Sequence, residues 1–149
     1  MVEKVTEARI GLGFHVSRGD GASPEVFTDI AEVIDLSPPS MTKDQVEATH
    51  TDSPGGFREF IPGLKDGGEF SLTMNFLPNN ATQGNASGGV LNDFLNETTT
   101  RNWRIEFPGS PSMYWTFKAS VIGFQPATPI DDRMTAVVSF KVAGAPTIS

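Results

Sequence analysis

The chain contains no cysteine, which excludes disulfide bonds, thiolate metal sites and cysteine nucleophiles and leaves the redox compartment open. Charged residues make up only 19% of its 149 residues, and no apolar run approaches the ~20 residues of a membrane span. Residues 1–4, MVEK, lack the apolar stretch of a secretion signal. We therefore expect synthesis in a cytoplasm and no membrane partner.

Basic residues are also scarce, 11 against 18 acidic ones, and the net charge of -7 is spread along the chain. Two interpretations remain open: ordinary solubility charge, or a surface that must pass or exclude a polyanion. The basic residues never cluster with aromatics into a stripe that would bind nucleic acid. The length predicts one domain, residues 1–149, because a chain of this size buries roughly 70% of its unfolded surface.

Groups of residues arranged for catalysis or metal binding are missing as well. His50, Asp52 and Ser53 supply the residue types of a hydrolytic triad, but neighbours on an extended segment point to opposite faces. The two histidines lie far apart without a metal-binding spacing, and Asp131-Asp132 has the character of a hairpin loop. We predict that the protein is not an enzyme and has no catalytic, cofactor or metal site.

Alternating apolar and polar residues predict a mainly β fold. Strand patterns occur at residues 10–16, 25–36, 45–52, 69–77, 102–107, 115–121 and 134–142. One short helix is expected after Ser87 as N-cap, with Val90, Leu91, Phe94 and Leu95 on one stripe. About seven antiparallel strands with one helix at the side and long loops favour a β-sandwich or small barrel.

The segment from residue 37 to 67 is predicted to be an extended loop rich in turn formers, among them Pro54-Gly55-Gly56 and Pro62-Gly63. Its apolar and charged side chains would be exposed wastefully in a monomer but would find partners on a neighbouring copy. The interface candidates are Phe57, Arg58, Phe60, Ile61, Leu64 and Lys65. The alternative, a loop packed on its own sandwich, also stays open.

Several segments in this order resemble the major tail tube proteins of long-tailed, non-contractile bacteriophages. They are FREFIPGLKDGGEFSLTMNF at residues 57–76, the helix at 91–95, the strand at 103–107, and PIDDRMTAVVSFKVAG at 129–144. The resemblance extends from about Thr28 onward. Some family members carry an additional immunoglobulin-like C-terminal domain, and we expect this chain to be the tube-forming domain alone.

The resemblance implies a structural virion protein that forms stacked hexameric rings, a hollow tail tube through which double-stranded DNA passes without specific binding. It further implies tape measure, tail terminator and distal tail or baseplate partners, assembly in the bacterial host cytoplasm, and intersubunit ion pairs from Arg58 and Lys65. Candidates for the lumen are the polar faces of regular strands: Glu69, Ser71, Thr73 and Asn75, and also Glu47 and Glu106. Acidic groups there would repel DNA phosphates.

Two other functions remain possible at this stage. Contractile tails and type VI secretion systems use a tube subunit of related fold, which a sheath would cover. A carbohydrate-binding β-sandwich module could use Trp103 and Trp115 as a sugar-stacking platform. Each tryptophan is in phase with an aliphatic face, however, and this favours packing in the core.

Overall fold

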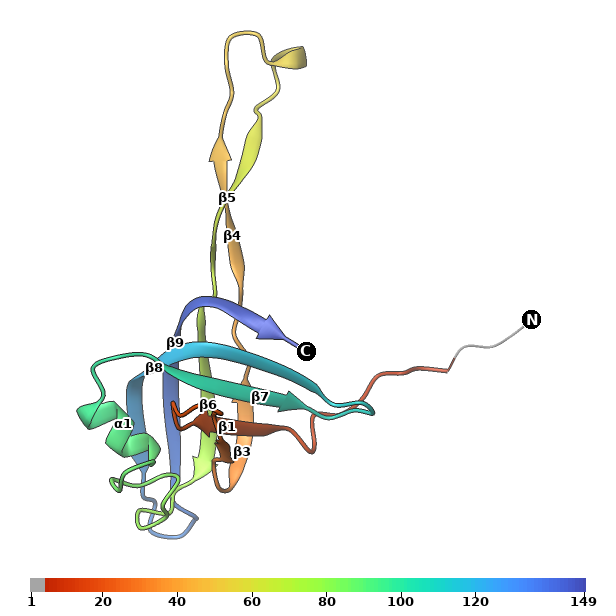
Figure 1. Ribbon diagram of the computed structural model, residues 1–149. Helices are drawn as coiled ribbons and strands as arrows, with labels where there is room; N and C mark the ends of the chain where they lie inside the picture. The colour runs from red at the N-terminus through yellow and green to blue at the C-terminus, as the bar shows by residue number, and fades with distance from the viewer. Residues whose placement is uncertain (1–4) are drawn as a thin grey trace.

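A seven-stranded antiparallel sheet forms the body of the protein, and two further strands form an arm that projects from it (Figure 1). The computed structural model describes residues 5–149. The body strands, in sheet order, are β2 (Phe27–Asp29), β1 (His15–Gly19), β7 (Arg101–Phe107), β8 (Met113–Ala127), β9 (Thr135–Ile148), β6 (Glu69–Asn75) and β3 (Val33–Ser37). The arm consists of β4 (Thr42–Glu47) and β5 (Phe60–Asp66). The predicted mainly β fold is confirmed.

The two edge strands of the sheet, β2 and β3, are consecutive in the chain and are joined by residues 30–32. The Ile30 N–H donates to the Val16 carbonyl on β1 at 2.9 Å, and the Asn75 N–H on β6 donates to the Glu32 carbonyl at 2.9 Å. One short connection is thus bonded to both sides of the sheet. The sheet therefore curls around a single core, as a sandwich or small barrel requires.

Large apolar side chains from opposite parts of the curled sheet meet in this core. The Phe140 ring on β9 stacks on Phe70 of β6 with centroids 4.3 Å apart and contacts Trp103 of β7 at 4.7 Å. Trp103 is buried, and its indole N–H donates to the Ala119 carbonyl at 3.2 Å. Trp115 packs against Phe107 at 5.0 Å. Core packing, favoured by the phase of both tryptophans, is confirmed for Trp103, whereas Trp115 is partly buried and packs against the core.

The α-helix α1 (Val90–Asn96) packs at the side of the body against β8, and a short 3-10 helix, η1 (Pro54–Gly56), lies at the end of the arm. The N-cap of α1 is Gly89, not the predicted Ser87, because the chain makes a further turn through Gly88 at a φ of 97°. Phe94 and Leu95, expected on the buried stripe, remain exposed. The helix has only two turns. It buries Val90, as the predicted stripe requires, together with Asp93.

Two predicted strands are misplaced. The alternating residues 10–14 form no strand, and β1 begins only at His15; residues 48–52 leave the ladder after β4 ends at Glu47. In both segments the alternation is real, but apart from a hydrogen bond between Ala48 and Glu59 these residues have no partner strand. A backbone turn from the Ser53 N–H to the His50 carbonyl, at 3.1 Å, then closes the end of the arm.

Candidate functional site

The arm is the most distinctive feature of the molecule, and it is a β-hairpin instead of the expected loop at 37–67. Antiparallel pairing, for example Val46 opposite Ile61, holds β4 against β5. Because β4 follows β3 and β5 leads into β6, the arm continues the β3–β6 hairpin away from the body (Figure 1). Nearly every arm side chain is exposed, so the arm does not pack on its own sandwich.

The end of the arm, residues 47–59, is an ordered unit that we call the knob. The Ala48 N–H donates to the Glu59 carbonyl at 2.8 Å, and the Glu59 carboxylate accepts the Ser53 hydroxyl at 2.8 Å. His50 Nε2 lies 3.2 Å from the same carboxylate. Because the serine hydroxyl donates to Glu59 and not to the imidazole, these residues lack the geometry of an activated nucleophile.

Phe57 is displayed at the surface of the knob, with 75% of the residue exposed. Gly55 and Gly56 adopt left-handed φ values of 65° and 71°, which reverse the chain beside it. A Cβ at position 55 would lie 3.1 Å from the Phe57 ring, so the ring lies directly over that glycine. The aromatic side chain therefore lies beside the backbone of the turn and remains open to solvent.

The other five interface candidates lie along the same hairpin. Phe60, Ile61 and Leu64 are at least half exposed, and Lys65 is exposed near the body. Arg58 lies 3.9 Å from the Glu47 carboxylate, a loose and largely solvated ion pair. The hairpin thus brings the six predicted residues together on one projecting element, with the apolar ones open to solvent.

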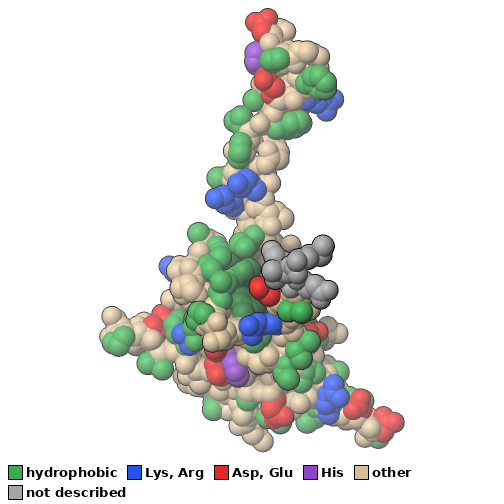
Figure 2. Space-filling view, turned by 90° about the vertical axis from the view of Figure 1, so that its right-hand side faces the viewer, with side chains coloured by type: hydrophobic (Ala, Val, Ile, Leu, Met, Phe, Trp, Pro, Cys, Tyr) green, Lys and Arg blue, Asp and Glu red, His purple; other side chains and the backbone are tan. Residues whose placement is uncertain are grey.

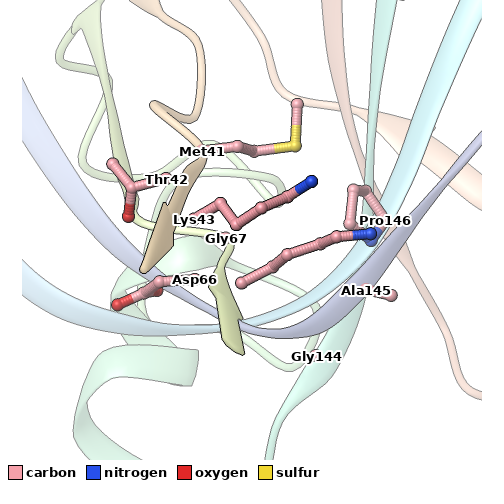
Figure 3. A pocket seen from close by; sticks show the side chains of 9 residues that line it. Met41, Thr42, Lys43, Asp66, Gly67, Gly144, Ala145 and Pro146 are labelled. Atoms are coloured by element: carbon pink, nitrogen blue, oxygen red, sulfur yellow. The ribbon is translucent and has the colours of Figure 1, made fainter. Parts of the chain in front are cut away.

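A cleft of about 420 Å³ lies where the arm meets the body, and we call it the basal cleft. Its lining residues come from both arm strands and from β9: Met41, Thr42, Lys43, Lys65, Asp66, Gly67, Gly144, Ala145 and Pro146. Figure 3 shows Met41 and Lys43 on one side of the cleft and residues 144–146 on the other. Figure 2 shows hydrophobic side chains gathered on the body just below the arm. Because the lining comes from segments far apart in sequence, residue patterns alone did not indicate it.

Asp66 fixes the base of the arm beside this cleft. Its carboxylate accepts the Gly68 N–H at 2.8 Å and lies 3.3 Å from Lys141 Nζ on β9. The Gly68 hydrogen bond, followed by the Lys141 ammonium, holds the pKa of Asp66 below its ordinary value. The junction between arm and body is thus stabilised by a charged carboxylate.

The lumen candidates fall on three different elements. Ser71, Thr73 and Asn75 share the outer face of β6, with Thr73 beside Asp35 of β3 and Val137 of β9. Glu69 is exposed and lies opposite Lys141. Glu106 lies on β7, which β8 and β9 separate from β6, and Glu47 lies on the arm. The four β6 residues therefore share one surface, and the two glutamates stand apart from it.

Residues 5–149 lack two features that would indicate other protein classes. No three His, Asp or Glu side chains in this part of the chain are grouped as metal ligands. No helix found there has the length and apolarity needed to cross a membrane.

The exposed arm on a curled β body can be compared with known families. A family model described as the lambda phage tail tube protein matches residues 15–149. The chain belongs to this tail tube protein family. The resemblance found in the sequence is thereby confirmed, and the protein is a structural tube subunit of a phage-type tail.

Solved structures share the fold of this tail tube protein at low sequence identity. The tail of an empty gene transfer agent (GTA) particle matches with a TM-score of 0.73, 16% identity, and coverage of 95% of this chain and 99% of that chain. A chain in a structure of the anti-feeding prophage cap, which terminates the tube, matches with a TM-score of 0.70, 13% identity, and coverage of 100% of this chain and 95% of that chain. A sheath/tube terminator structure of the extracellular contractile injection system PVC matches with a TM-score of 0.68, 16% identity, and coverage of 97% of this chain and 99% of that chain. None of the curated proteins compared with the chain matches it.

Proposed function

We propose that this tail tube protein self-assembles into hexameric rings that stack into a hollow tube, the conduit for double-stranded DNA, and that it has no enzymatic activity. The exposed arm is the observation that carries the proposal. It presents Phe57, Phe60, Ile61 and Leu64 to solvent on a hairpin that meets the body at its base. Exposed apolar surface of this kind marks protein contacts. The similar GTA tail was refined as a helix with C6 symmetry, which supports six copies per ring.

In this assembly the arm bridges neighbouring copies, with the six candidate residues Phe57, Arg58, Phe60, Ile61, Leu64 and Lys65 at the contact. Arg58 and Lys65 supply the cationic groups. A tube needs two kinds of contact from one small domain: a heterologous one that closes into a ring and an open one that repeats along the axis. A projecting hairpin can reach beyond its own ring and so provide the open contact.

The outer face of β6 is the proposed wall of the lumen. Its central residues Ser71, Thr73 and Asn75 are short and uncharged, and the neighbouring β9 positions include Ser139 and Thr135. Such a face offers DNA phosphates few cationic groups whose counterions could be released on binding. A reconstruction of the tube tests this arrangement: we expect Thr73 to face the channel, and Thr73 on the outer wall would overturn it.

The net charge of the protein also supports a tube through which DNA passes without binding to the wall. Six copies at -7 each carry -42 per ring, enough to disfavour DNA binding to any surface that the charge reaches. Glu69 contributes less than expected, because Lys141 lies directly across the strand from it. On the lumen face, we propose that small polar side chains prevent DNA adhesion more than fixed negative charge does.

The proposed partners are the other parts of a tail: a tape measure protein inside the tube, a tail terminator at one end and distal tail or baseplate proteins at the other. Chains that share the fold occur in structures of a tube-terminating cap and of a sheath/tube terminator, which supports a tube whose ends are closed by other proteins. We place synthesis and assembly in the cytoplasm of a bacterial host, before the tail becomes part of the virion.

Negative-stain electron microscopy of the purified, concentrated protein tests self-assembly. We expect rings or tubes of constant diameter for the native chain and for Ile130→Asp, a control at a fully exposed loop residue. We expect Ile61→Asp to prevent assembly, because a carboxylate would have to be desolvated at the contact. A native chain that stays monomeric even when seeded with tail tips would overturn the proposed function.

A further inference from the structure

We propose that the knob of one copy occupies the basal cleft of a second copy, with Phe57 as the apolar anchor and acidic knob residues facing Lys43 and Lys65. This inference rests on the proposed tube assembly and names the surface that receives the arm. It follows from four features of the described chain: a preformed knob, an apolar cleft, complementary charge, and the distance between the two.

The knob is organised before it binds. The hydrogen bonds of Glu59 with Ala48 and Ser53 fix the loop, and Phe57 lies over Gly55. A loop that is already ordered loses little backbone freedom on binding, and buried aromatic anchors often dominate interface energetics. Within the described chain the knob packs only on itself, so this order serves no visible purpose in the monomer.

The basal cleft has the size and lining to receive such an anchor. Its volume is about 420 Å³, whereas an apolar cavity of about 150 Å³ already holds benzene. Met41, Ala145 and Pro146 supply apolar surface, and Gly67 and Gly144 leave room beside them. A phenyl ring would therefore fit together with part of the knob backbone.

Charge complementarity identifies the knob as the occupant. Lys43 and Lys65 are directly opposite each other in the β4–β5 ladder, a like-charge arrangement that destabilises a hairpin. Within residues 5–149 neither lysine has an acidic group at ion-pair distance, since the nearby Asp66 is engaged by Lys141. The knob carries three carboxylates, Glu47, Asp52 and Glu59, against the single guanidinium of Arg58. An acidic knob would relieve the repulsion between the two lysines.

The length of the arm makes this contact intermolecular. About 12 residues separate Thr42 at the cleft from Pro54 in the knob, and at ~3.3 Å per residue they span at most about 40 Å. A knob cannot return to its own cleft across that distance along a paired hairpin. The contact is therefore between copies, and in a stack of rings that all point the same way it would be a heterologous contact that repeats along the axis.

Engineered disulfides test the contact cleanly, because the chain has no cysteine of its own. Full-length Arg58→Cys, on the knob beside the anchor, is mixed with Thr42→Cys or Ala145→Cys from the two sides of the cleft and oxidised under assembly conditions. We expect a heterodimer on non-reducing gels, with the linked peptides identified by mass spectrometry. Asn79→Cys, in an exposed loop outside the cleft, is the matched control and should not link.

The other outcomes are equally decisive. Native tubes that form while Arg58→Cys links to neither cleft position would overturn this inference and leave the assembly intact. Linkage of the cleft cysteines to Ile10→Cys, on the exposed N-terminal segment, would assign the cleft to that segment instead and also overturn it. A native chain that forms no tubes at all would overturn the proposed function itself.

A charge-reversal series supplies a second measurement that does not depend on disulfide geometry. We expect Lys65→Glu to raise the concentration needed for assembly at least tenfold, and Asp52→Lys combined with it to recover most of the loss. Arg133→Glu, on an exposed loop far along the chain, changes the net charge equally and should have little effect. Equal effects of Lys65→Glu and Arg133→Glu, or no recovery in the double variant, would contradict the pairing.

Discussion

Asp93 shows how much one residue contributes to this body. Its carboxylate, only 3% exposed, lies 2.6 Å and 2.9 Å from two nitrogens of Arg18 on β1 and so ties α1 to the sheet. Asp93→Asn leaves the Arg18 guanidinium buried without its charge partner, and we expect the free energy of unfolding to fall by roughly 3–5 kcal/mol. Urea unfolding of the unassembled protein measures this loss.

The matched control for Asp93 is Asp131→Asn, which removes the same charge in an exposed loop. Surface substitutions of this kind usually change stability by no more than about 0.5 kcal/mol. Similar losses in the two variants would mean that the Arg18–Asp93 pair has no special role in holding the helix.

Asp66 gives a prediction about pH. Because its pKa is lowered in the folded protein, its contribution to stability is complete above the ordinary value of 3.8 and is lost as the pH falls through the lowered value. We expect the amide resonance of Gly68, which donates to this carboxylate, to titrate with a midpoint below 3.8. A midpoint at or above 3.8, or an unchanged titration in Asp66→Asn, would contradict the assignment.

At the residue scale, the sequence predicts what depends on local pattern. The buried set Phe70, Leu72 and Met74 follows from alternation along one strand, and Trp103 follows from its phase. The Arg18–Asp93 pair joins residues 75 positions apart, and no local spacing indicates it. The opposed lysines of the arm likewise required the register of two strands.

At the scale of elements, the arm is separable from the body. Replacing residues 48–59 by Asn-Gly, a favoured two-residue hairpin turn, removes most of the knob and keeps the ladder from β4 to β5. Since these residues bury almost nothing, we expect the free energy of unfolding to change by less than about 1 kcal/mol while assembly is lost. Chemical denaturation and size-exclusion chromatography measure the two effects.

The control for this truncation shortens another exposed loop, residues 128–133 between β8 and β9. Tubes should still form in that variant. Assembly that survives the loss of the knob would show that the arm contributes nothing to the contact, and a truncated body that unfolds would show that the arm is part of the fold.

Strand boundaries illustrate what periodicity cannot provide. Residues 10–14 and 48–52 alternate as convincingly as Glu69–Asn75, but only the latter lies between two partner strands, β3 and β9. A strand exists where its backbone groups find a ladder, and that depends on the rest of the fold. The same reasoning explains why the segment predicted as a loop is a hairpin. Its turn-forming residues are concentrated at the end of the hairpin and where the pairing of β4 with β5 is interrupted.

At the scale of the whole molecule, the long axis of the arm sets a dimension of the assembly. If the knob meets the basal cleft of the next copy, successive rings are separated by no more than the length of the arm, at most about 40 Å. Inserting two residues into each of β4 and β5 preserves the alternation of faces and lengthens the arm. For an arm parallel to the tube axis, we expect the axial repeat to grow by about 7 Å.

Cryo-electron microscopy of tubes from the lengthened variant measures this repeat directly. A two-residue insertion in the loop at residues 128–133 is the control and should leave the repeat unchanged, because that loop sets no distance between the knob and the cleft. An arm that runs oblique to the axis would lengthen the repeat by less, in proportion to its tilt. The outcome that would contradict this prediction is a repeat identical to that of the native tube, together with a longer arm that is ordered in the map. Ring spacing would then be set by contacts between bodies, and the arm would stabilise the stack without determining the spacing.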